Sequence, residues 1–357
     1  MGKLVLRFVG RMLSEDSITA SYSKEWAHAM KVLEKTSDLE KIKKGCVLTV
    51  GNFDGVHLGH REILTAAKQT AAQRRAELVV MTFEPHPLAI LHPQKAPGIL
   101  TPLAFKKYLL AEFGVDCLFV SESTPELLSL SPRDFVQRFL VENIQPAVVV
   151  EGESFNFGSG RTGGVQTLQK LGAEKGFEVS IVQAKEVKLS TGKTLTISST
   201  IIRDLLASGG AADAALTLGR AYRLIGQVVA GKGKGTQLGF PTLNMQPPQQ
   251  LIPAEGVYAG LVEIGDNFQQ VCSAKEKIPA VFSIGRSQTF GGDSPLAVEA
   301  HILTGDVGDL HGEWLAMDFV ERLRDQQKFE TDADLSAQIA KDCKKAREIL
   351  TTEGIRQ

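Results

Sequence analysis

The chain has 357 residues, which predicts about two domains, and its 40 Lys and Arg balance 41 Asp and Glu. The formal net charge of -1 argues against a nucleic-acid-binding surface, which needs a basic excess. No apolar run approaches the ~20 residues of a membrane span, and the 4 cysteines are too scattered for a disulfide framework or a zinc site, so a cytoplasmic protein is expected.

Residues 1–44 are predicted to be an N-terminal extension, to which the sequence gives no role. The opening residues are basic and apolar, but Arg7 and Arg11 interrupt the apolar part and no small-residue cleavage site follows. A secretory signal is therefore not expected.

Residues 45–208 are predicted to form a doubly wound α/β domain with a parallel sheet. Buried parallel strands read as continuous apolar runs, and helices make the crossovers between them. Strands are expected at 47–50, 78–83, 117–120, 147–150 and 178–182, and helices near 60–74, 102–113, 132–142, 165–175 and 200–208. Ligands of such sheets bind outside the carboxyl ends of the strands.

The pattern changes after residue 210, and residues 215–352 are predicted to form a second domain. Strands are expected at 222–230, 257–264, 278–284, 296–303 and 314–320. No long helix separates them, which favours a small antiparallel β-barrel or sandwich. An amphipathic helix closes the chain. Its apolar face recurs at steps of three or four and consists of Leu335, Ile339, Cys343, Ala346 and Leu350.

The segment 49–60, TVGNFDGVHLGH, follows the first strand of the sheet and opens a helix. Its glycines allow tight turns and a close approach of the backbone to a ligand. The helix start offers free N–H groups and a positive dipole end to phosphate. His57 and His60 are expected on one side of the first turn, where they could steady charge on a departing pyrophosphate. Either histidine alone could equally be a turn or cap residue.

Two later segments place polar groups at the same edge of the predicted sheet. Residues 82–87, TFEPHP, end the second strand, and residues 197–203, ISSTIIR, begin a helix. A Ser or Thr there would cap free N–H groups, and Arg203, one turn on, could hold phosphate oxygens. Taken alone, the first segment could be a proline-rich loop and the second a simple helix cap.

These segments resemble the HxGH, TFxPHP and SSTxxR motifs of the FAD synthetases, within the nucleotidylyltransferase superfamily. The resemblance implies that His57, His60 and Arg203 act in adenylyl transfer. It implies a flavin site at Phe83, Pro85, His86 and Pro87. It also implies ATP or phosphate contacts at Gly51, Asn52, Phe53, Asp54, Gly55, Gly59, Ser198, Ser199 and Thr200. The chain departs from the family pattern at Ser154, Asn156 and Gly164.

The segment 231–244, GKGKGTQLGFPTLN, follows the first strand of the second domain, and by itself it could be a flexible basic hairpin. Its ending resembles the GxPTxN motif of riboflavin kinases. The resemblance implies that Thr242 and Asn244 hold the Mg²⁺ of Mg-ATP, a hard cation that oxygen ligands suit. Lys234 and Thr236 stand where the family often has Arg, and Lys supplies a point charge in place of a bidentate fork. The implied phosphate-binding residues of this loop are Gly231, Gly233, Lys234 and Gly235.

Residues 280–290 and 297–301 resemble the family pattern NIGxxPTF followed by ExH, with Ser283 in place of Asn and Gln288 in place of Pro. Strand alternation places Glu299 on the face opposite to Val298 and Ala300. By itself Glu299 would be a solvent-facing residue. The resemblance makes it the catalytic base that accepts the proton of a hydroxyl attacking the γ-phosphate. It also implies a position near the flavin for Arg324.

The resemblance covers residues 45–350 and implies a bifunctional riboflavin kinase and FMN adenylyltransferase. Its ligands would be riboflavin, FMN and ATP, with Mg²⁺ as the cofactor, and no nucleic acid or membrane is expected as a partner. Three alternatives stay open: a kinase with an impaired adenylyltransferase half, the reverse, and a non-catalytic flavin- or nucleotide-binding regulator. The retained base and phosphate-binding groups argue against the regulator. The sequence does not determine the oligomeric state.

Overall fold

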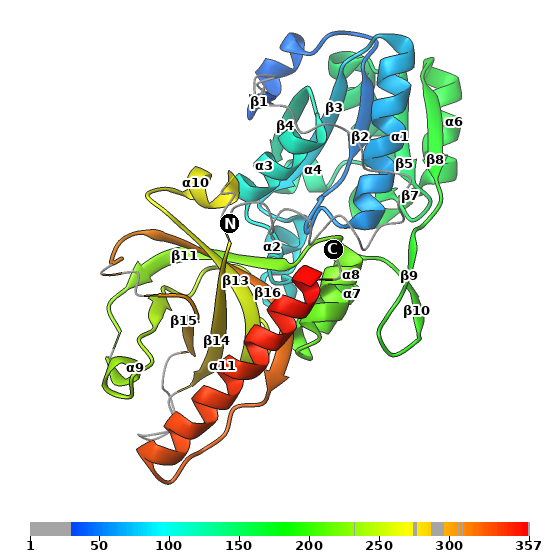
Figure 1. The fold of residues 1–357 in the computed structure, drawn as a ribbon. Helices are drawn as coiled ribbons and strands as arrows, with labels where there is room; N and C mark the ends of the chain where they lie inside the picture. Colours follow the sequence, from blue (N-terminus) through cyan, green and yellow to red (C-terminus); the bar gives the residue numbers. More distant parts are fainter. Residues whose placement is uncertain are drawn as a thin grey trace. The chain divides into compact units, whose positions relative to one another are not determined.

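The computed structural model describes residues 30–231, 233–273, 277–286, 296–305, 308 and 310–355. This part of the chain divides into two compact units (Figure 1). The first, called the sheet unit, holds residues 30–188 and 194–199. The second, called the barrel unit, holds residues 189–193 and 200–355.

The sheet unit is built on six parallel strands in the order β1-β4-β3-β2-β5-β8, which confirms the predicted doubly wound fold. The order of the strands reverses between β2 and β5, since β3 and β4 follow on one side of β2 and β5 and β8 on the other, so the topological switch point lies there. The strands are β1 (Lys31–Leu33), β2 (Val47–Val50), β3 (Leu78–Glu84), β4 (Cys117–Glu122), β5 (Val148–Gly152) and β8 (Glu178–Val182).

Helices cover both faces of this sheet, because successive apolar residues of each strand point to opposite sides. Helices α1 (Leu58–Arg74) and α3 (Leu103–Phe113) pack with Val47 and Val80 on one face. The 3-10 helix η1 (Thr36–Lys41), the π-helix η3 (Val136–Ile144) and α6 (Val165–Lys175) pack on the other. Shorter elements complete the unit: α2 (Pro87–Leu91), η2 (Pro93–Lys95), α4 (Pro125–Leu128), α5 (Pro132–Phe135), β6 (Asn156–Phe157), η4 (Ser159–Arg161), β7 (Gly163–Gly164), β9 (Glu186–Lys188) and β10 (Thr194–Thr196).

The sheet begins earlier than the predicted domain start at residue 45. Strand β1 pairs with β4 in parallel, and Leu39 of η1 and Ile42 are buried in the core of the unit. The sequence did not indicate β1 because the strand has only 3 residues, of which Leu33 alone is buried.

The barrel unit is a closed antiparallel barrel in the order β11-β12-β15-β14-β13-β16, which confirms the predicted barrel and excludes the sandwich. Its interior is aromatic: the ring of Phe319 meets those of Phe282 and Tyr258 at centroid distances of 5.0 and 5.2 Å. The strands are β11 (Tyr222–Val229), β12 (Leu243–Met245), β13 (Gly256–Gly265), β14 (Ile278–Arg286), β15 (Leu296–Ile302) and β16 (Trp314–Arg324).

Five helices belong to or enter the barrel unit: α7 (Ser199–Ala207), α8 (Ala211–Leu218), α9 (Lys234–Gln237), α10 (Phe268–Ser273) and α11 (Asp332–Ile355). The division near residue 200 precedes the predicted junction because α7 is tied to the barrel, where Ala254 N–H donates to the Leu206 carbonyl at 3.0 Å. Helix α11 packs Cys343 and Ala346 against Val257 and Val281, as its apolar periodicity predicted.

A buried ionic cluster fixes one side of the barrel. Arg223 donates two bonds of 2.7 Å to the Asp318 carboxylate and one of 2.8 Å to Glu263, and Lys277 donates to Asp318 at 2.6 Å. Burial alone would raise the pKa of Asp318, but Arg223 and Lys277 outweigh it and hold that pKa well below its usual range. Asp318 is therefore ionised at neutral pH.

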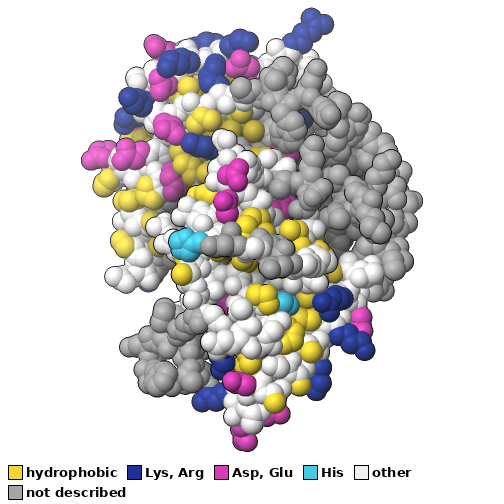
Figure 2. Space-filling view, turned by 60° about the vertical axis from the view of Figure 1, so that its left-hand side comes forward, with side chains coloured by type: hydrophobic (Ala, Val, Ile, Leu, Met, Phe, Trp, Pro, Cys, Tyr) yellow, Lys and Arg dark blue, Asp and Glu magenta, His cyan; other side chains and the backbone are white. Residues whose placement is uncertain are grey.

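The surface mixes charges of both signs. Figure 2 shows one face, on which Lys and Arg lie interspersed with Asp and Glu among hydrophobic side chains. This distribution agrees with the net charge of -1. Among the helices of the described ranges, none is both long enough and apolar enough to cross a membrane.

Candidate functional site

Strands β2 and β5 separate at the switch point of the sheet unit. They pair through Val47 with Val148 and Leu48 with Val149, and then they diverge. Doubly wound sheets bind ligands at such points, beyond the carboxyl ends of the parallel strands. The segment 51–57 leaves β2 at this end and leads into α1.

His57 and His60 form a stacked pair at the start of α1. His57 is the N-cap, and its Nδ1 accepts a bond of 3.2 Å from His60 N–H, while the two rings stack with centroids 3.6 Å apart. Burial, with smaller effects from His57 and Lys106, lowers the pKa of His60 well below its usual value. His60 is therefore a neutral imidazole at neutral pH, able to donate one hydrogen bond and accept another.

The loop before these histidines is held by its own polar groups. The Asp54 carboxylate accepts from Leu100 N–H at 3.0 Å and from Thr101 N–H at 2.9 Å, and Thr101 Oγ1 accepts from Gly55 N–H at 3.1 Å. Phe53 has a φ of +47°, a region that L-residues rarely occupy and that is common at binding sites. Asp54 thus stabilises the loop, and its predicted contact with ATP or phosphate stays a prediction.

The segment 197–203 meets the same loop at its beginning. Ser199 Oγ donates to the Asp54 carbonyl at 2.8 Å, so the start of α7 lies beside the loop that carries the histidines. Arg203 lies one turn further, half-buried, in the part of α7 that belongs to the barrel unit. Its predicted contact with phosphate stays a prediction, as do those of Ser198 and Thr200.

The segment 82–87 is linked to the loop by two contacts through Asn52. Thr82 Oγ1 donates to the Asn52 carbonyl at 3.1 Å, and the Asn52 amide lies 3.1 Å from His86 Nε2. Hydrogen bonds therefore join two segments that are separate in the sequence. One was predicted to bind phosphate and the other to bind flavin.

The departures from the family pattern lie in a two-stranded hairpin. Asn156 of β6 pairs with Gly164 of β7. The Asn156 amide donates back to the Ser154 carbonyl at 2.7 Å, and both side chains are exposed. The Asn156 side chain thus makes its hydrogen bond within the hairpin itself.

Two buried charged residues in this unit were not singled out from the sequence. Glu151 is 2% exposed at the end of β5, and its carboxyl accepts from Val50 N–H at 2.6 Å. Burial raises the pKa of Glu151 well above its usual value. Lys106 of α3 is 4% exposed, and burial lowers its pKa against the opposing effect of Asp54 and Glu84. The sequence could have indicated both residues, because each is an ionisable residue within a strand or helix of mostly apolar residues.

The barrel unit brings three predicted positions into one row across neighbouring strands. Glu299 of β15 lies directly opposite Asn244 of β12 on one side and Ser283 of β14 on the other. All three are half-buried on the face opposite to the barrel core. Side chains directly opposite each other in antiparallel strands are close enough to interact, so a carboxylate, an amide and a hydroxyl converge here.

The glycine-rich loop packs closely over this row. A Cβ at Gly231 would overlap the Asn244 amide, and one at Gly235 would overlap the Phe240 carbonyl. The overlap at Gly235 is with backbone, so glycine is required there, whereas at Gly231 the Asn244 side chain would have to move. Lys234 is exposed and lies 3.4 Å from Asp332. Lys232 and Gln288 lie outside the described residues.

Two further residues of the barrel unit have defined structural partners. His301 Nδ1 lies 2.8 Å from the Pro241 carbonyl, and its ring meets Phe240 edge-on, so it supports the segment that carries Thr242. Arg324 donates to both oxygens of Asp342 on α11, at 2.8 to 3.1 Å, and thereby ties the helix to the barrel. Its predicted position near the flavin stays a prediction.

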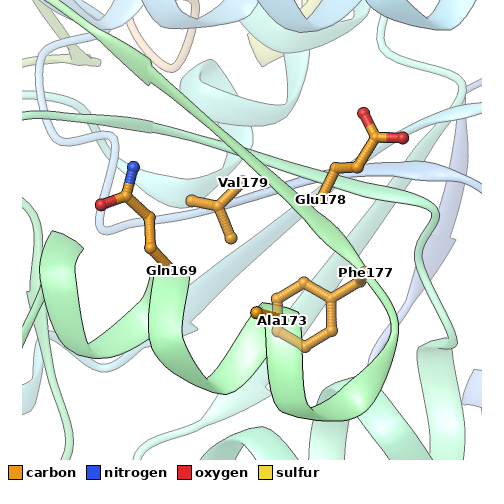
Figure 3. A pocket seen from close by; sticks show the side chains of 5 residues that line it. All are labelled: Gln169, Ala173, Phe177, Glu178 and Val179. Carbon is orange, nitrogen blue, oxygen red and sulfur yellow. The ribbon is translucent and has the colours of Figure 1, made fainter.

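A surface pocket between α6 and β8 does not belong to either site (Figure 3). It is lined by Gln169, Ala173, Phe177, Glu178 and Val179. Because β8 begins at Glu178, the pocket lies at the amino end of that strand. The loops of the candidate site lie at the carboxyl ends.

The fold is that of a two-domain transferase, in which a parallel sheet carries the segment 49–60 and a barrel carries the glycine-rich loop 231–244. A family model described as FAD synthetase matches residues 39–200, and one described as riboflavin kinase matches residues 218–350. The chain belongs to the family of bifunctional riboflavin kinase/FMN adenylyltransferases, as its motifs predicted.

The relatives span nearly the whole chain. The bifunctional riboflavin kinase/FMN adenylyltransferase of Escherichia coli (strain K12) is 36% identical over 321 residues, which cover 89% of this chain and 97% of that protein. The protein of the same description from Pseudomonas fluorescens is 34% identical over 318 residues, with the same coverage. A crystal structure titled a macrolide-efflux protein from Streptococcus pneumoniae is similar with a TM-score of 0.76 and 28% identity, covering 88% of this chain and 98% of that one.

Proposed function

We propose that the chain makes FMN in its barrel unit and FAD in its sheet unit. In the first reaction the 5′-hydroxyl of riboflavin attacks the γ-phosphate of Mg-ATP, giving FMN and ADP. In the second, the FMN phosphate attacks the α-phosphate of another ATP, giving FAD and pyrophosphate. The observation that carries this proposal is that the chain has two compact units, and that the FAD synthetase match, residues 39–200, and the riboflavin kinase match, residues 218–350, fall largely on different ones.

In the barrel unit, Glu299 would accept the proton of the attacking hydroxyl. Its position between Asn244 and Ser283 supports this role, because the row lies beside the loop that begins at Gly231. Thr242 and Asn244 carry the oxygen donors that Mg²⁺ prefers, so they would hold the ion, which would neutralise phosphate charge when bound. Gly233, Lys234 and Gly235 would line the phosphates.

In adenylyl transfer, His57 and His60 of the sheet unit, together with Arg203 of α7, would stabilise the charge on the departing pyrophosphate. The stacked imidazoles at the start of α1 support this role, since the first turn of a helix also offers free backbone N–H groups to an anion. Phe83, Pro85, His86 and Pro87 would border the flavin. All 4 cysteines are free and buried in the structure, which supports the proposed cytoplasmic location.

The test is chromatography of the purified chain with riboflavin, ATP and Mg²⁺, beside a reaction that starts from FMN. Glu299→Gln should stop FMN formation and leave FAD formation from supplied FMN, and His60→Ala should do the reverse. Loss of both products in either variant would contradict two independent sites. FMN as the only product of the unaltered chain would indicate a kinase with a disabled transferase half, and no product at all would indicate a regulator.

A further inference from the structure

Asn52 and His86 connect the two loops of the sheet unit, with 3.1 Å between the Asn52 amide and His86 Nε2. We propose that His86 orients the Asn52 amide so that its two N–H donors face a phosphoryl oxygen of a bound substrate. This inference rests on the adenylyl transfer proposed above. It gives His86 a positioning role in phosphate binding, in addition to its predicted place beside the flavin.

The protonation state of His86 follows from its other nitrogen. Leu88 N–H donates to His86 Nδ1 at 3.1 Å, so Nδ1 is the acceptor and carries no proton. A neutral imidazole has one donor and one acceptor, and an imidazolium has two donors. His86 is therefore neutral, and its proton is on Nε2.

This tautomer determines how the Asn52 amide is turned. A protonated Nε2 can donate only to an oxygen, so the Asn52 atom that faces it is Oδ1. The oxygen and nitrogen of an amide exchange places when the group rotates by half a turn, and the hydrogen-bond network decides between the two orientations. The Nδ2 group then points away from His86.

In the structure Nδ2 of Asn52 faces His86, and Oδ1, on the other side, is buried and has no hydrogen-bond partner within the described ranges of the chain. After the half-turn that the His86 tautomer requires, the unpartnered atom is the donor Nδ2. A buried donor left without an acceptor costs about 1–3 kcal/mol. Thr82 already donates to the Asn52 carbonyl, so the backbone at this position is fixed. The arrangement therefore favours a bound ligand that supplies the acceptor.

The class of that acceptor follows from the position of the loop. Asn52 precedes the amino end of α1, a helix of 17 residues whose start carries positive partial charge. The buried Lys106 adds positive charge near His60 in the same unit. These groups favour an anion, so the acceptor is a phosphoryl oxygen, carried by either FMN or ATP.

The decisive variant is Asn52→Asp in the full chain. Aspartate keeps an oxygen for His86 Nε2–H, but it replaces the outward N–H donors with a carboxylate oxygen. FAD formation from FMN should fall by about 100-fold, the loss expected for a hydrogen bond to a charged group. FMN formation from riboflavin should stay unchanged. Asn143→Asp, which adds the same charge on η3, serves as the matched control and should keep both activities.

Kinetics then distinguish the two phosphate sources, because a higher KM for FMN assigns the contact to the FMN phosphate and a higher KM for ATP assigns it to the nucleotide. An Asn52→Asp variant with full activity would overturn the inference.

A second measurement does not depend on activity: ¹⁵N NMR should show His86 as the neutral Nε2–H tautomer at pH 7. An Nδ1–H tautomer would overturn the argument. Failure of the unaltered chain to make FAD would instead refute the proposed function.

Discussion

Glu151 gives a prediction whose size follows directly from its burial. In the unfolded chain this carboxyl group ionises above its ordinary pKa of 4.5, whereas burial keeps it protonated in the folded sheet unit at higher pH. Folding must therefore take up a proton, and this becomes harder as the pH rises. The stability contributed by the neutral carboxyl group is fully present below pH 4.5 and is lost as the pH rises through the raised pKa.

Replacing the residue by glutamine removes this proton uptake. Glu151→Gln keeps an oxygen that can accept from Val50 N–H. The free energy of unfolding of the variant should rise relative to the unaltered chain by about 1.4 kcal/mol for each pH unit above 4.5 until the raised pKa is reached. The gain should therefore be larger at pH 7 than at pH 5.

Urea-induced unfolding of the full chain, followed by circular dichroism at several pH values, measures this difference. Glu153→Gln is the matched control, because that neighbouring side chain is exposed, and it should show no growing difference. A stability gain for Glu151→Gln that is the same at pH 5 and pH 7 would refute the reasoning, since it would mean that the folded protein holds an ionised carboxylate.

Three further predictions concern groups whose contacts are defined. Asp318→Asn should destabilise the barrel unit by about 3–5 kcal/mol in urea unfolding, because Arg223 and Lys277 would lose the buried carboxylate that both contact, and Glu263 alone would remain to balance them. Arg324→Lys should lower the melting temperature by breaking the paired bonds to Asp342; a raised KM for riboflavin in this variant would support its predicted place near the flavin. The His60 ring should stay neutral in an NMR titration from pH 8 to pH 6, and a midpoint near the ordinary value of 6.5 would contradict its burial.

The regular elements were largely predictable because their patterns are local. Continuous apolar runs such as Val148–Gly152 indicated the central strands of the sheet, and the alternation of Leu296–Ile302 placed Glu299 away from the barrel core. Strands β1 and β12 were missed because each has 3 residues, too few to show a period. The proximity of His57 and His60 was predictable for the same reason, since their spacing fits one helical turn.

Contacts between residues far apart in the sequence could not be predicted from such local patterns. The row of Asn244, Glu299 and Ser283 depends on the pairing register of three strands, which the sequence pattern of one strand does not determine. The bond from Val50 to Glu151 joins residues 101 positions apart. It exists because β2 and β5 separate beyond Leu48, so that a side chain supplies the acceptor that the neighbouring backbone would otherwise provide.

The short edge strand β1 determines where a fragment that contains the sheet unit alone should start. A fragment that starts at the predicted boundary, residue 45, would lack the three pairs that join β1 to β4. The backbone groups of β4 along that side would then be uncovered, and such an edge is a template for pairing with another chain. A fragment that includes Lys31–Leu33 should stay monodisperse at concentrations where the shorter one aggregates.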